Sequence, residues 1–405
     1  MASKTASSLV LATISLHRSA GGIEKNNTCL ANAMVERGYR VTIITFDQSD
    51  ATPFYPTDSR IVWSKVGETR PHGRITFRQR LRLIRRCREV IAKAGDRPIV
   101  VCFHHGILIR FLLATVMLKA SILCSERNSL THYNFIKLNK WNLNFLALFL
   151  VKRVIVQFPS YLADYPRLVR RRITVIPNPV VPAKVFASPA LPSECGRYIL
   201  LAAARLSHQK NLDTLIRAFS DLAPRHPDWD LFIMGEGEHR RSLEALVGAC
   251  GLGSRVFMPG ASGQMHEWFV KSHLFCIPSR WEGFPNALAE ALAHGLPCVG
   301  YQGCAGVKDL IASGENGLLA SGNGDLASLR DAIDTLMSDG NARTRMGAAA
   351  TQGMAIFEPH AIFSRWEQLL QTHTGVRSHG DPARSRYKIS SATGREASLK
   401  FPEQY

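Results

Sequence analysis

Short apolar runs alternate with amphipathic stretches along most of the chain. Such alternation is typical of βαβ units, in which helices connect parallel strands. The pattern predicts two series of strands, one on each side of a proline-rich stretch. The first series comprises residues 9–15, 41–45, 99–103, 122–125, 154–157 and 173–176, and the second comprises 198–202, 230–234, 256–258, 274–277 and 297–300.

The proline-rich stretch, residues 177–195, contains five prolines and few periodic apolar positions, which is typical of an interdomain linker. We therefore predict an α/β protein with two Rossmann-like, doubly wound domains that face a central cleft. The first domain is residues 1–185 and the second is residues 196–350. Ligands of such sheets bind beyond the carboxyl ends of the strands. Residues 371–405 are polar, basic and without periodicity, so we expect them to be disordered.

The charge is distributed unevenly along the 405 residues, whose formal net charge is +18. Residues 1–185 hold 29 Lys and Arg against 10 Asp and Glu, whereas residues 186–405 hold 21 against 22. This asymmetry indicates two domains with different tasks, the first of which faces an anionic partner.

A predicted helix over residues 77–91 concentrates this charge. Its six arginines face a single acid, Glu89, and a solvated helix would normally mix the two signs. Helical spacing indicates that one apolar face holds the helix against its domain. The apolar face consists of Phe77, Leu81, Ile84, Cys87 and Ile91, and the residues predicted to contact a membrane or another anionic partner are Arg78, Arg82, Arg85 and Arg86.

The charge of this helix allows three interpretations. Anionic phospholipid headgroups, or a polyprenyl diphosphate, match it. The arginines can also be merely solubilising. Nucleic acid is disfavoured because the sequence offers no aromatic stacking platform and no known RNA or DNA module.

The remaining composition favours an intracellular protein. The nine cysteines lack any C-x-x-C pair and fall mostly in apolar runs, which predicts buried free thiols in a reducing cytosol. Residues 1–8 show no secretory signal. The longest apolar runs, 107–118 and 143–151, are too short to span a bilayer. We expect a cytoplasmic protein, peripheral to the inner face of the cytoplasmic membrane.

The segment 280–295 carries the strongest local signal. Pro285 suits a first helical position and Gly295 suits a C-terminal cap, which predicts a helix over residues 285–294 after a strand and a loop. The free N–H groups of its first turn favour an anion such as phosphate. Glu290 follows by roughly 7–8 Å along the axis, so its carboxylate suits a ribose diol. The alternative is a solvated helix glutamate.

A second signal is the pair Arg205 and Lys210, on the loop after the strand 198–202. Two cations there can clamp a diphosphate and stabilise it as it leaves. The alternative is a surface loop whose charges have no ligand.

These residues belong to a series of ordered motifs that resembles the retaining family-4 glycosyltransferases of GT-B fold, in the form found in bacterial capsule, exopolysaccharide and lipid-linked oligosaccharide synthesis. Glu282 and Glu290 match the paired glutamates of that family. The other matching segments are Gly21-Gly22-Ile23-Glu24, Ser125-Glu126-Arg127-Asn128, Ile176-Pro177-Asn178-Pro179, Ile233 to Gly237, Met258 to Gly260, Pro278 to Asn286 and Gly314 to Leu318.

The resemblance implies a role for each motif. Arg205 and Lys210 would bind the donor's diphosphate, Glu290 the ribose, and Glu282 the transferred sugar. Either His104 or His105 would face that sugar, and residues 351–370 would form a helix returning to the first domain. The remaining donor contacts would come from Gly21, Gly22, Gly283, Phe284, Asn286, Ala287 and Leu288.

Other chemistries find less support. Asp228-Trp229-Asp230 spells D-x-D, yet it leads into a strand and is interpreted as structural. Gly235-x-Gly237 lacks the rest of a dinucleotide fingerprint, and no H-E-x-x-H pair occurs. We therefore expect neither a metal nor a cofactor, with the nucleotide-diphospho-sugar acting as co-substrate.

The sequence thus predicts a retaining hexosyltransferase that moves a sugar from a nucleotide-diphospho-sugar, expected to be a UDP-sugar, to a glycan or lipid-linked acceptor at the inner membrane face. Surface polysaccharide or glycolipid synthesis is the expected context. Alternatives are other GT-B chemistry, such as a phosphorylase or a sugar-nucleotide epimerase, and a non-catalytic membrane- or nucleic-acid-binding protein on the same scaffold.

Overall fold

The computed structural model describes residues 7–17, 21–67, 76–130 and 143–373. Most of residues 1–8 and of the tail 371–405 therefore lie outside the described residues. The chain divides into two compact units. The N-terminal unit comprises residues up to Pro179, the segment Glu282–Asn286 and the described part of Phe357–Val376; the C-terminal unit comprises Val180–Trp281 and Ala287–Ile356.

The N-terminal unit is built on a seven-stranded sheet in the order β3-β2-β1-β4-β5-β6-β7, and every pairing is parallel. The strand order reverses between β1 and β4, where Leu9 pairs with Val41 on one side and Ile99 on the other. The strands are β1 (Ser8–Ala12), β2 (Arg40–Thr45), β3 (Val62–Lys65), β4 (Ile99–Phe103), β5 (Ser121–Ser125), β6 (Arg153–Val156) and β7 (Ile173–Val175).

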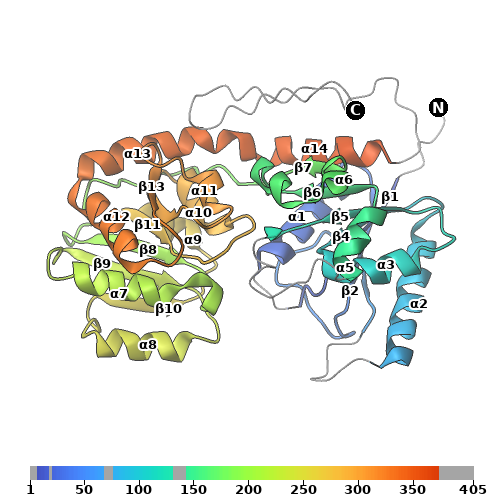
Figure 1. The fold of residues 1–405 in the computed structure, drawn as a ribbon, viewed down its shortest axis with the longest axis horizontal. Helices are drawn as coiled ribbons and strands as arrows, with labels where there is room; N and C mark the ends of the chain where they lie inside the picture. The colour runs from blue at the N-terminus through green and yellow to red at the C-terminus, as the bar shows by residue number, and fades with distance from the viewer. Residues whose placement is uncertain (1–6, 18–20, 68–75, 131–142, 374–405) are drawn as a thin grey trace. The chain divides into compact units, whose positions relative to one another are not determined.

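Helices cover this sheet, so β1 and β4 are fully buried, and apart from Ser8 their residues are apolar. The core includes Leu9 and Leu11 of β1 together with Ile362 and Trp366 of the C-terminal helix. The helices are α1 (Gly22–Glu36), α2 (Phe77–Ala94), α3 (Leu108–Ala114), α5 (Leu143–Leu146), α6 (Arg167–Arg170) and α14 (Pro359–Gln371), with 3-10 turns η1 (His105–Ile107), η2 (Ala147–Leu150) and η3 (Pro159–Asp164) (Figure 1).

The C-terminal unit repeats the same plan with six parallel strands in the order β10-β9-β8-β11-β12-β13. The strand order reverses between β8 and β11, where Leu200 pairs with Leu274. The strands are β8 (Tyr198–Ala203), β9 (Trp229–Met234), β10 (Val256–Gly260), β11 (Leu274–Ile277), β12 (Cys298–Tyr301) and β13 (Gly317–Ala320).

Two helices of this unit begin at an aspartate whose side chain accepts from a first-turn N–H group. Asp325 accepts from Ser328 N at the start of α12, and Asp339 accepts from Ala342 N at the start of α13. The elements are η4 (His208–Lys210), α7 (Leu212–Leu222), α8 (Arg240–Ala249), α9 (Met265–Lys271), α10 (Asn286–Ala293), α11 (Val307–Leu310), α12 (Leu326–Ser338), α13 (Gly340–Gly353) and η5 (Ala355–Phe357) (Figure 1).

The structure corrects the predicted apolar face of α2. Leu83, Cys87 and Ile91, spaced four apart, are the buried residues, whereas Phe77 is 75% and Leu81 is 50% exposed. The first turns of the helix therefore extend beyond the surface on which its later turns pack. α2 nevertheless begins at a full capping box between Thr76 and Gln79.

Two further corrections concern local signals. The helix predicted from Pro285 begins at Asn286, so Pro285 precedes it. All nine cysteines are free, and six are buried as predicted, whereas Cys29 and Cys250 are partly exposed and Cys195 is exposed.

Candidate functional site

Three loops follow the carboxyl ends of β1, β4 and β5, next to the point where the strand order of the N-terminal unit reverses. This is the edge at which ligands of doubly wound sheets bind. The loops bring Gly21 and Gly22 to the start of α1, His104 and His105 to the end of β4, and Glu126 and Arg127 to the end of β5.

Gly283 lies where backbone atoms leave no room for a side chain, and Gly22 lies against the end of the Asn286 side chain. A Cβ on Gly22 would lie 2.6 Å from Asn286 Nδ2, and a Cβ on Gly283 would lie 1.8 Å from the carbonyl oxygen of Arg127. Gly283 also forms an isolated antiparallel bridge with Asn128 and accepts a hydrogen bond from the Tyr161 hydroxyl. The Glu282–Asn286 segment is thus held against the β5 loop by backbone contacts.

Phe284 anchors the same segment through its ring. The ring is stacked on Phe158, with centroids 5.3 Å apart and planes at 5°, and meets Phe357 edge-on at 5.6 Å. Glu282, next to Gly283, is also buried. A donor contact from Phe284 would therefore come from its backbone, since its side chain is part of the packing.

Asn178 links four segments that are distant in sequence. Its Oδ1 accepts hydrogen bonds from Asn26 Nδ2 and from Arg127 Nη1, the latter at 2.8 Å, and its Nδ2 donates to Asn286 Oδ1 at 2.9 Å. Asn178 is 5% exposed, so its amide cannot exchange these partners for water. The sequence singled out the Pro177-Asn178-Pro179 motif, but neither Asn26 nor this network.

Arg127 is a buried cation, 5% exposed, between the rings of Phe103 and Trp366 at 5.1 and 5.6 Å. Among the described residues its Nε and Nη2 have no hydrogen-bond partner. Burial lowers the pKa of Arg127 to about 9, although the negative charge of Glu126 acts against this shift. The guanidinium is therefore held by aromatic faces and by one amide, Asn178.

Glu126 and His105 form a buried ion pair at the ends of β5 and β4. His105 donates to the Glu126 carboxylate twice, from its backbone N at 2.5 Å and from Nδ1 at 2.8 Å. The Glu126 side chain is fully buried, and that of His105 is 4% exposed. The sequence placed Glu126 in a motif but gave it no role, because the pairing joins residues from two separate strand ends.

In the C-terminal unit, the loop after β8 carries Arg205 and Lys210. Arg205 is exposed, with its Nε 3.6 Å from Glu238 Oε2, and Lys210 closes the half-buried turn η4. The loop is fixed by the buried Leu206, whose N–H donates to Glu236 O at 2.9 Å. A Cβ on Gly237 would lie 2.3 Å from Leu206 O, so the Gly235-x-Gly237 turn provides close backbone packing.

The segment after β11 is joined to the loop that carries Lys210. Arg280 N donates to Gln209 O at 2.8 Å, and Gln209 Nε2 donates to Trp281 O at 2.7 Å. β8 and β11 are the neighbours at which the strand order reverses, so both segments lie at the ligand-binding edge. Arg280 is a cation of this edge that sequence reasoning did not assign, and its buried Nε has no partner among the described residues.

The helix α10 follows this segment. Ala287 and Glu290 are partly exposed, whereas the side chain of Leu288 is fully buried, so only the backbone amide of Leu288 can meet a ligand. Glu290 lies in the second turn, and its backbone carbonyl accepts from His294 Nδ1 at 2.7 Å.

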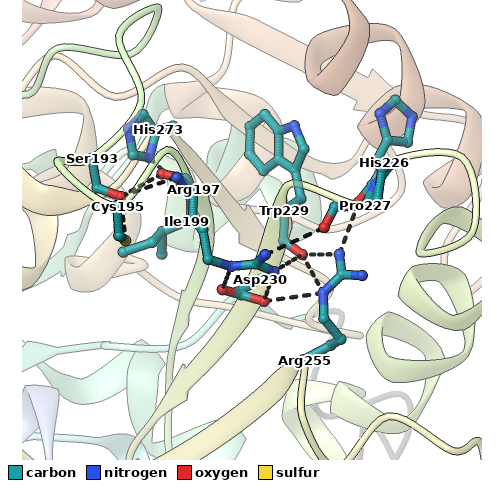
Figure 2. A network of polar contacts seen from close by, with 10 residues as sticks. All are labelled: Ser193, Cys195, Arg197, Ile199, His226, Pro227, Trp229, Asp230, Arg255 and His273. Carbon is teal, nitrogen blue, oxygen red and sulfur yellow. Dashed lines mark hydrogen bonds and ion pairs between the residues drawn. The ribbon is translucent and has the colours of Figure 1, made fainter.

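Asp230, the second acid of Asp228-Trp229-Asp230, is bound by two arginines at the amino ends of the strands (Figure 2). It accepts from Arg197 Nε and Nη2, and from Arg255 Nε at 3.1 Å. Arg255 also donates to His226 O at 2.8 Å. The carboxylate thus joins β8, β9 and the start of β10, at the edge opposite the ligand-binding one. Within the described residues, no group of three or more His, Cys, Asp or Glu side chains is placed to hold a metal ion.

The four arginines predicted on α2 differ in their surroundings. Arg78 and Arg82 are exposed, and within the described parts of the chain neither is paired with an acid. Arg85 pairs with Glu89 at 3.0 Å on the surface. Arg86 instead donates to the carbonyl oxygens of Val66 and Gly67 at 2.8 and 3.2 Å, which makes it part of the packing of α2. No helix in the described residues is long and apolar enough to cross a membrane.

Family models of known proteins match both halves of the chain. Residues 20–184 match a family model described as Glycosyltransferase Family 4, and residues 186–353 match one described as Glycosyl transferases group 1. An uncharacterized glycosyltransferase of Haemophilus influenzae is 24% identical over 87% of this chain and 97% of its own length.

Other relatives match only in part. An exopolysaccharide phosphotransferase of Streptomyces coelicolor is 36% identical over 44% of this chain. The matched part covers 19% of the length of that protein. A lipopolysaccharide core biosynthesis mannosyltransferase of Rhizobium meliloti is 31% identical over 42% of this chain and 50% of its own length.

Solved structures share the whole fold. Sucrose-phosphate synthase from Thermosynechococcus elongatus superposes with a TM-score of 0.74 at 19% identity, over 90% of this chain and 98% of that one. An Anabaena protein, HepE, crystallised with UDP and glucose, superposes with a TM-score of 0.71 at 16% identity, over 90% of this chain and all of that one. The two family matches together span nearly all of residues 20–353, so this chain is a glycosyltransferase of GT-B fold and belongs to the family-4 type.

Proposed function

We propose that the chain is a retaining hexosyltransferase that uses a nucleotide-diphospho-sugar, with UDP as the nucleotide, and requires no metal ion. The observation that carries the proposal is the hydrogen-bonded junction between the Lys210 loop and the Arg280 segment at the reversal point of the C-terminal sheet. It brings cations from two adjacent strand ends to one edge, which is the charge pattern that a diphosphate requires.

The donor would be bound from the phosphates outward. Arg205 and Lys210 would hold the diphosphate, with Arg280 beside them, and the first amides of α10, at Asn286, Ala287 and Leu288, would point at the distal phosphate. The carboxylate of Glu290 would accept from the ribose hydroxyls. The HepE structure with UDP and glucose supports UDP as the nucleotide, because that protein shares the fold.

In the reaction, the bond between the sugar's anomeric carbon and the diphosphate oxygen would break as the acceptor hydroxyl attacks from the same face. The departing diphosphate would take the acceptor's proton, so configuration is retained without a protein nucleophile. The negative charge that develops on the leaving diphosphate would be stabilised by Arg205 and Lys210, which stand in for a metal ion. Glu282, Gly283, Phe284 and the histidine pair would contact the transferred sugar, with the Gly21-Gly22 loop beside the diphosphate.

The acceptor would be a glycan or a lipid-linked saccharide of surface polysaccharide or glycolipid synthesis. The names of the relatives from Streptomyces coelicolor and Rhizobium meliloti support this context. The exposed side chains of Arg78, Arg82, Phe77 and Leu81 support a site of action at an anionic membrane surface, because basic and apolar side chains both contribute to binding such a surface. The protein would be cytoplasmic and peripheral to the inner face of the cytoplasmic membrane.

Calorimetric titration with nucleotides, comparing wild type with Glu290→Gln, tests the donor site. We expect UDP to bind, and the variant to lose about 1.5–3 kcal/mol of binding free energy, because a charge-assisted hydrogen bond to the ribose is lost. Glu244→Gln, on the surface of α8, should bind as wild type does. If GDP binds and UDP does not, the proposed nucleotide is wrong. If Glu290→Gln binds UDP as tightly as the wild type does, Glu290 is not part of the donor site.

A further inference from the structure

A hollow of about 340 Å³ lies at the amino ends of the strands of the N-terminal sheet, and its described lining consists of Arg97, Lys119, Ser121 and His373. Arg97 and Lys119 precede β4 and β5 by two residues, and Ser121 is the first residue of β5. His373 lies two residues after the end of α14. The volume falls within the range of roughly 300–1,000 Å³ that small-molecule sites occupy.

The backbone around this hollow is fixed by the sheet. Ser121 pairs with Ile99, and its N–H donates to Pro98 O at 3.0 Å. On the other side, Lys152 N donates to Ile122 O at 2.9 Å. The hollow thus lies where three adjacent strands begin. A strand of five residues, about 17 Å long, separates it from the carboxyl edge, where the ligands of such sheets bind.

The two cations of the hollow have no structural task among the described residues. Arg97 and Lys119 are exposed, and within those residues neither side chain is paired with an acid or donates to a carbonyl. Arg172, in the same unit, instead donates to the carbonyl oxygens of Phe149 and Val151 at 2.6 and 3.2 Å. The packing therefore uses Arg172, whereas the charges of Arg97 and Lys119 remain available to a ligand.

Positive charge in the hollow is not balanced by an acid of its described lining. Asp96 is exposed next to Arg97 but does not belong to that lining. Burial lowers the pKa of the His373 imidazole, and the charges of Arg153 and Lys152 lower it further. The His373 Nε2 is shielded from water and has no hydrogen-bond partner among the described residues. A polar wall of this kind costs free energy until a ligand or a water held by it supplies the missing partner.

We propose that this hollow is a second ligand site, specific for a phosphate group, in which Arg97 and Lys119 bind the phosphate oxygens and the Ser121 hydroxyl donates to them. The guanidinium can bind two oxygens at once, and the ammonium and the hydroxyl provide further donors. A phosphate monoester carries up to two negative charges and three acceptor oxygens, which matches two cations and a hydroxyl. A carboxylate offers only two oxygens and one charge.

The same phosphate chemistry has two sources, a small soluble phosphate and the headgroup of a phospholipid. The proposal goes beyond the proposed function and does not depend on it. The donor's diphosphate is assigned to Arg205 and Lys210 of the C-terminal unit, whereas this hollow lies within the N-terminal unit, at the amino edge of the other sheet.

NMR of the histidine rings, in the full chain with labelled histidine, tests the site directly because one ring lines it. His373→Gln assigns the ring by the signal that it removes. We expect inorganic phosphate to shift the His373 signal in a saturable way, and chloride at the same ionic strength to shift it little. An unsaturable response that chloride reproduces would mean general screening of charge and would contradict a phosphate site.

Substitutions of the two cations test their roles. Lys119→Gln and Arg97→Gln should each raise the phosphate concentration at half-saturation by at least about tenfold, because each removes a charge-assisted hydrogen bond. Both side chains are exposed, so folding should be unaffected, as circular dichroism can check. The matched control is Lys93→Gln, an exposed lysine in the last turn of α2 that is not part of the described lining. It should respond as the wild type does.

The donor site must be separated from this one, since it is also proposed to bind phosphate groups. The double variant Arg205→Ala with Lys210→Ala should leave the response of the His373 signal unchanged. A response that disappears in this variant would show that phosphate acts from the C-terminal unit, and the proposal would be wrong. Failure of the protein to bind any nucleotide-sugar would refute the proposed function and leave the His373 result as the test of the hollow.

Vesicles of phosphatidylcholine with phosphatidylglycerol distinguish the two sources. If the ligand is a lipid headgroup, Arg97→Gln with Lys119→Gln should sediment less with these vesicles than Lys93→Gln does. If the ligand is a soluble phosphate, the two proteins should sediment equally while their responses to inorganic phosphate differ. The proposal is wrong if the double variant matches Lys93→Gln both in sedimentation and in the response of the His373 signal.

Discussion

Asn178 donates a hydrogen bond of 2.9 Å to Asn286, the first residue of α10, and the same amide accepts from Asn26 and Arg127. One buried side chain thus holds the proline-rich stretch, α1, the β5 loop and the end of the Glu282–Asn286 segment together. Because Asn26, Arg127 and Asn178 are themselves buried, the network is expected to be sensitive to the removal of any of them.

Asn178→Ala should therefore destabilise the protein by about 2–4 kcal/mol, since several buried polar groups lose their partner at once. Urea unfolding followed by circular dichroism measures this loss. Asn178→Asp keeps the acceptor for Asn26 and Arg127 but cannot donate to Asn286, so its loss should be smaller. Asn341→Ala, an exposed position in α13, is the control. Equal stability of Asn178→Ala and Asn341→Ala would show that the network contributes nothing.

Gly283→Ala should reduce the stability of the protein more than the addition of one methyl group usually does. The added Cβ would lie 1.8 Å from Arg127 O and 2.9 Å from Asn128 Cα, and backbone atoms cannot move aside as a flexible side chain can. We expect a loss of stability at the upper end of the roughly 1–3 kcal/mol typical of overpacking, measured by thermal unfolding. Gly263→Ala adds the same methyl group where nothing lies within 4 Å, so it should be neutral. A neutral Gly283→Ala would contradict the close approach.

Some elements of the fold could be predicted from the sequence and others could not. Apolar runs predicted β1, β4, β8 and β11 because strands that are covered on both faces consist mostly of apolar residues. β3 was missed because it is a short edge strand with Val62 exposed, and β13 because it is four residues long and begins with glycine.

The sequence could propose candidate site residues only where they lie close together along the chain. Arg205, Lys210 and Glu290 follow from a loop and a helix that can be read along the chain. The roles of Asn26, Arg127 and Glu126 depend on partners 21 to 152 positions away. On α2 the sequence predicted the buried Cys87 and Ile91 correctly, but it chose Phe77 and Leu81 in place of Leu83, because both sets share a helical spacing and only tertiary packing selects one.

The Glu126 and His105 pair should give stability a defined pH dependence. Against the burial that would raise it, His105 lowers the pKa of Glu126 to about 2 from 4.5, so this contribution is present above pH 4.5 and is lost as the pH falls toward 2. The pKa of His105 is raised from 6.5, so its contribution is present below pH 6.5 and is lost as the pH rises beyond that value.

The stability difference between wild type and Glu126→Gln should therefore be largest between about pH 4.5 and 6.5 and should shrink on both sides. Urea midpoints measured from pH 3 to 8 check this. A difference that is constant across that range would mean that the pair is not ionised in the folded protein.

Arg205→Ala and Lys210→Ala should reduce turnover more than donor affinity, because the diphosphate gains charge only as it leaves. We expect kcat to fall on the order of 10²-fold and the donor Kd to change far less. Arg241→Ala, exposed on α8, should be active. EDTA should leave activity largely intact. Loss of transfer on chelation, with recovery on added Mg²⁺ or Mn²⁺, would show that the reaction depends on a metal ion.

The last prediction concerns the beginning of α2, where Arg78, Arg82 and Arg85 are exposed beside the exposed Phe77 and Leu81. Reversing the three arginines to glutamate should abolish sedimentation with anionic liposomes, because each basic side chain near such a surface contributes about 1 kcal/mol. Nucleotide binding should be unchanged. Arg86 is kept, since its bonds to Val66 and Gly67 carbonyls make its replacement a test of folding instead.

The control for these liposome experiments reverses three exposed arginines of the C-terminal unit, Arg217, Arg241 and Arg345, and changes the net charge by the same amount. If overall charge caused binding, both triple variants would lose it equally. The double variant Phe77→Ser with Leu81→Ser separates electrostatic attraction from apolar insertion. It removes the side chains that can insert into the membrane and leaves the charge of the arginines. Wild-type binding should weaken steeply with salt, since the surface potential decays within about 8 Å at physiological ionic strength. Binding that persists in high salt and disappears in the serine variant would make the apolar side chains, not the arginines, the membrane contact.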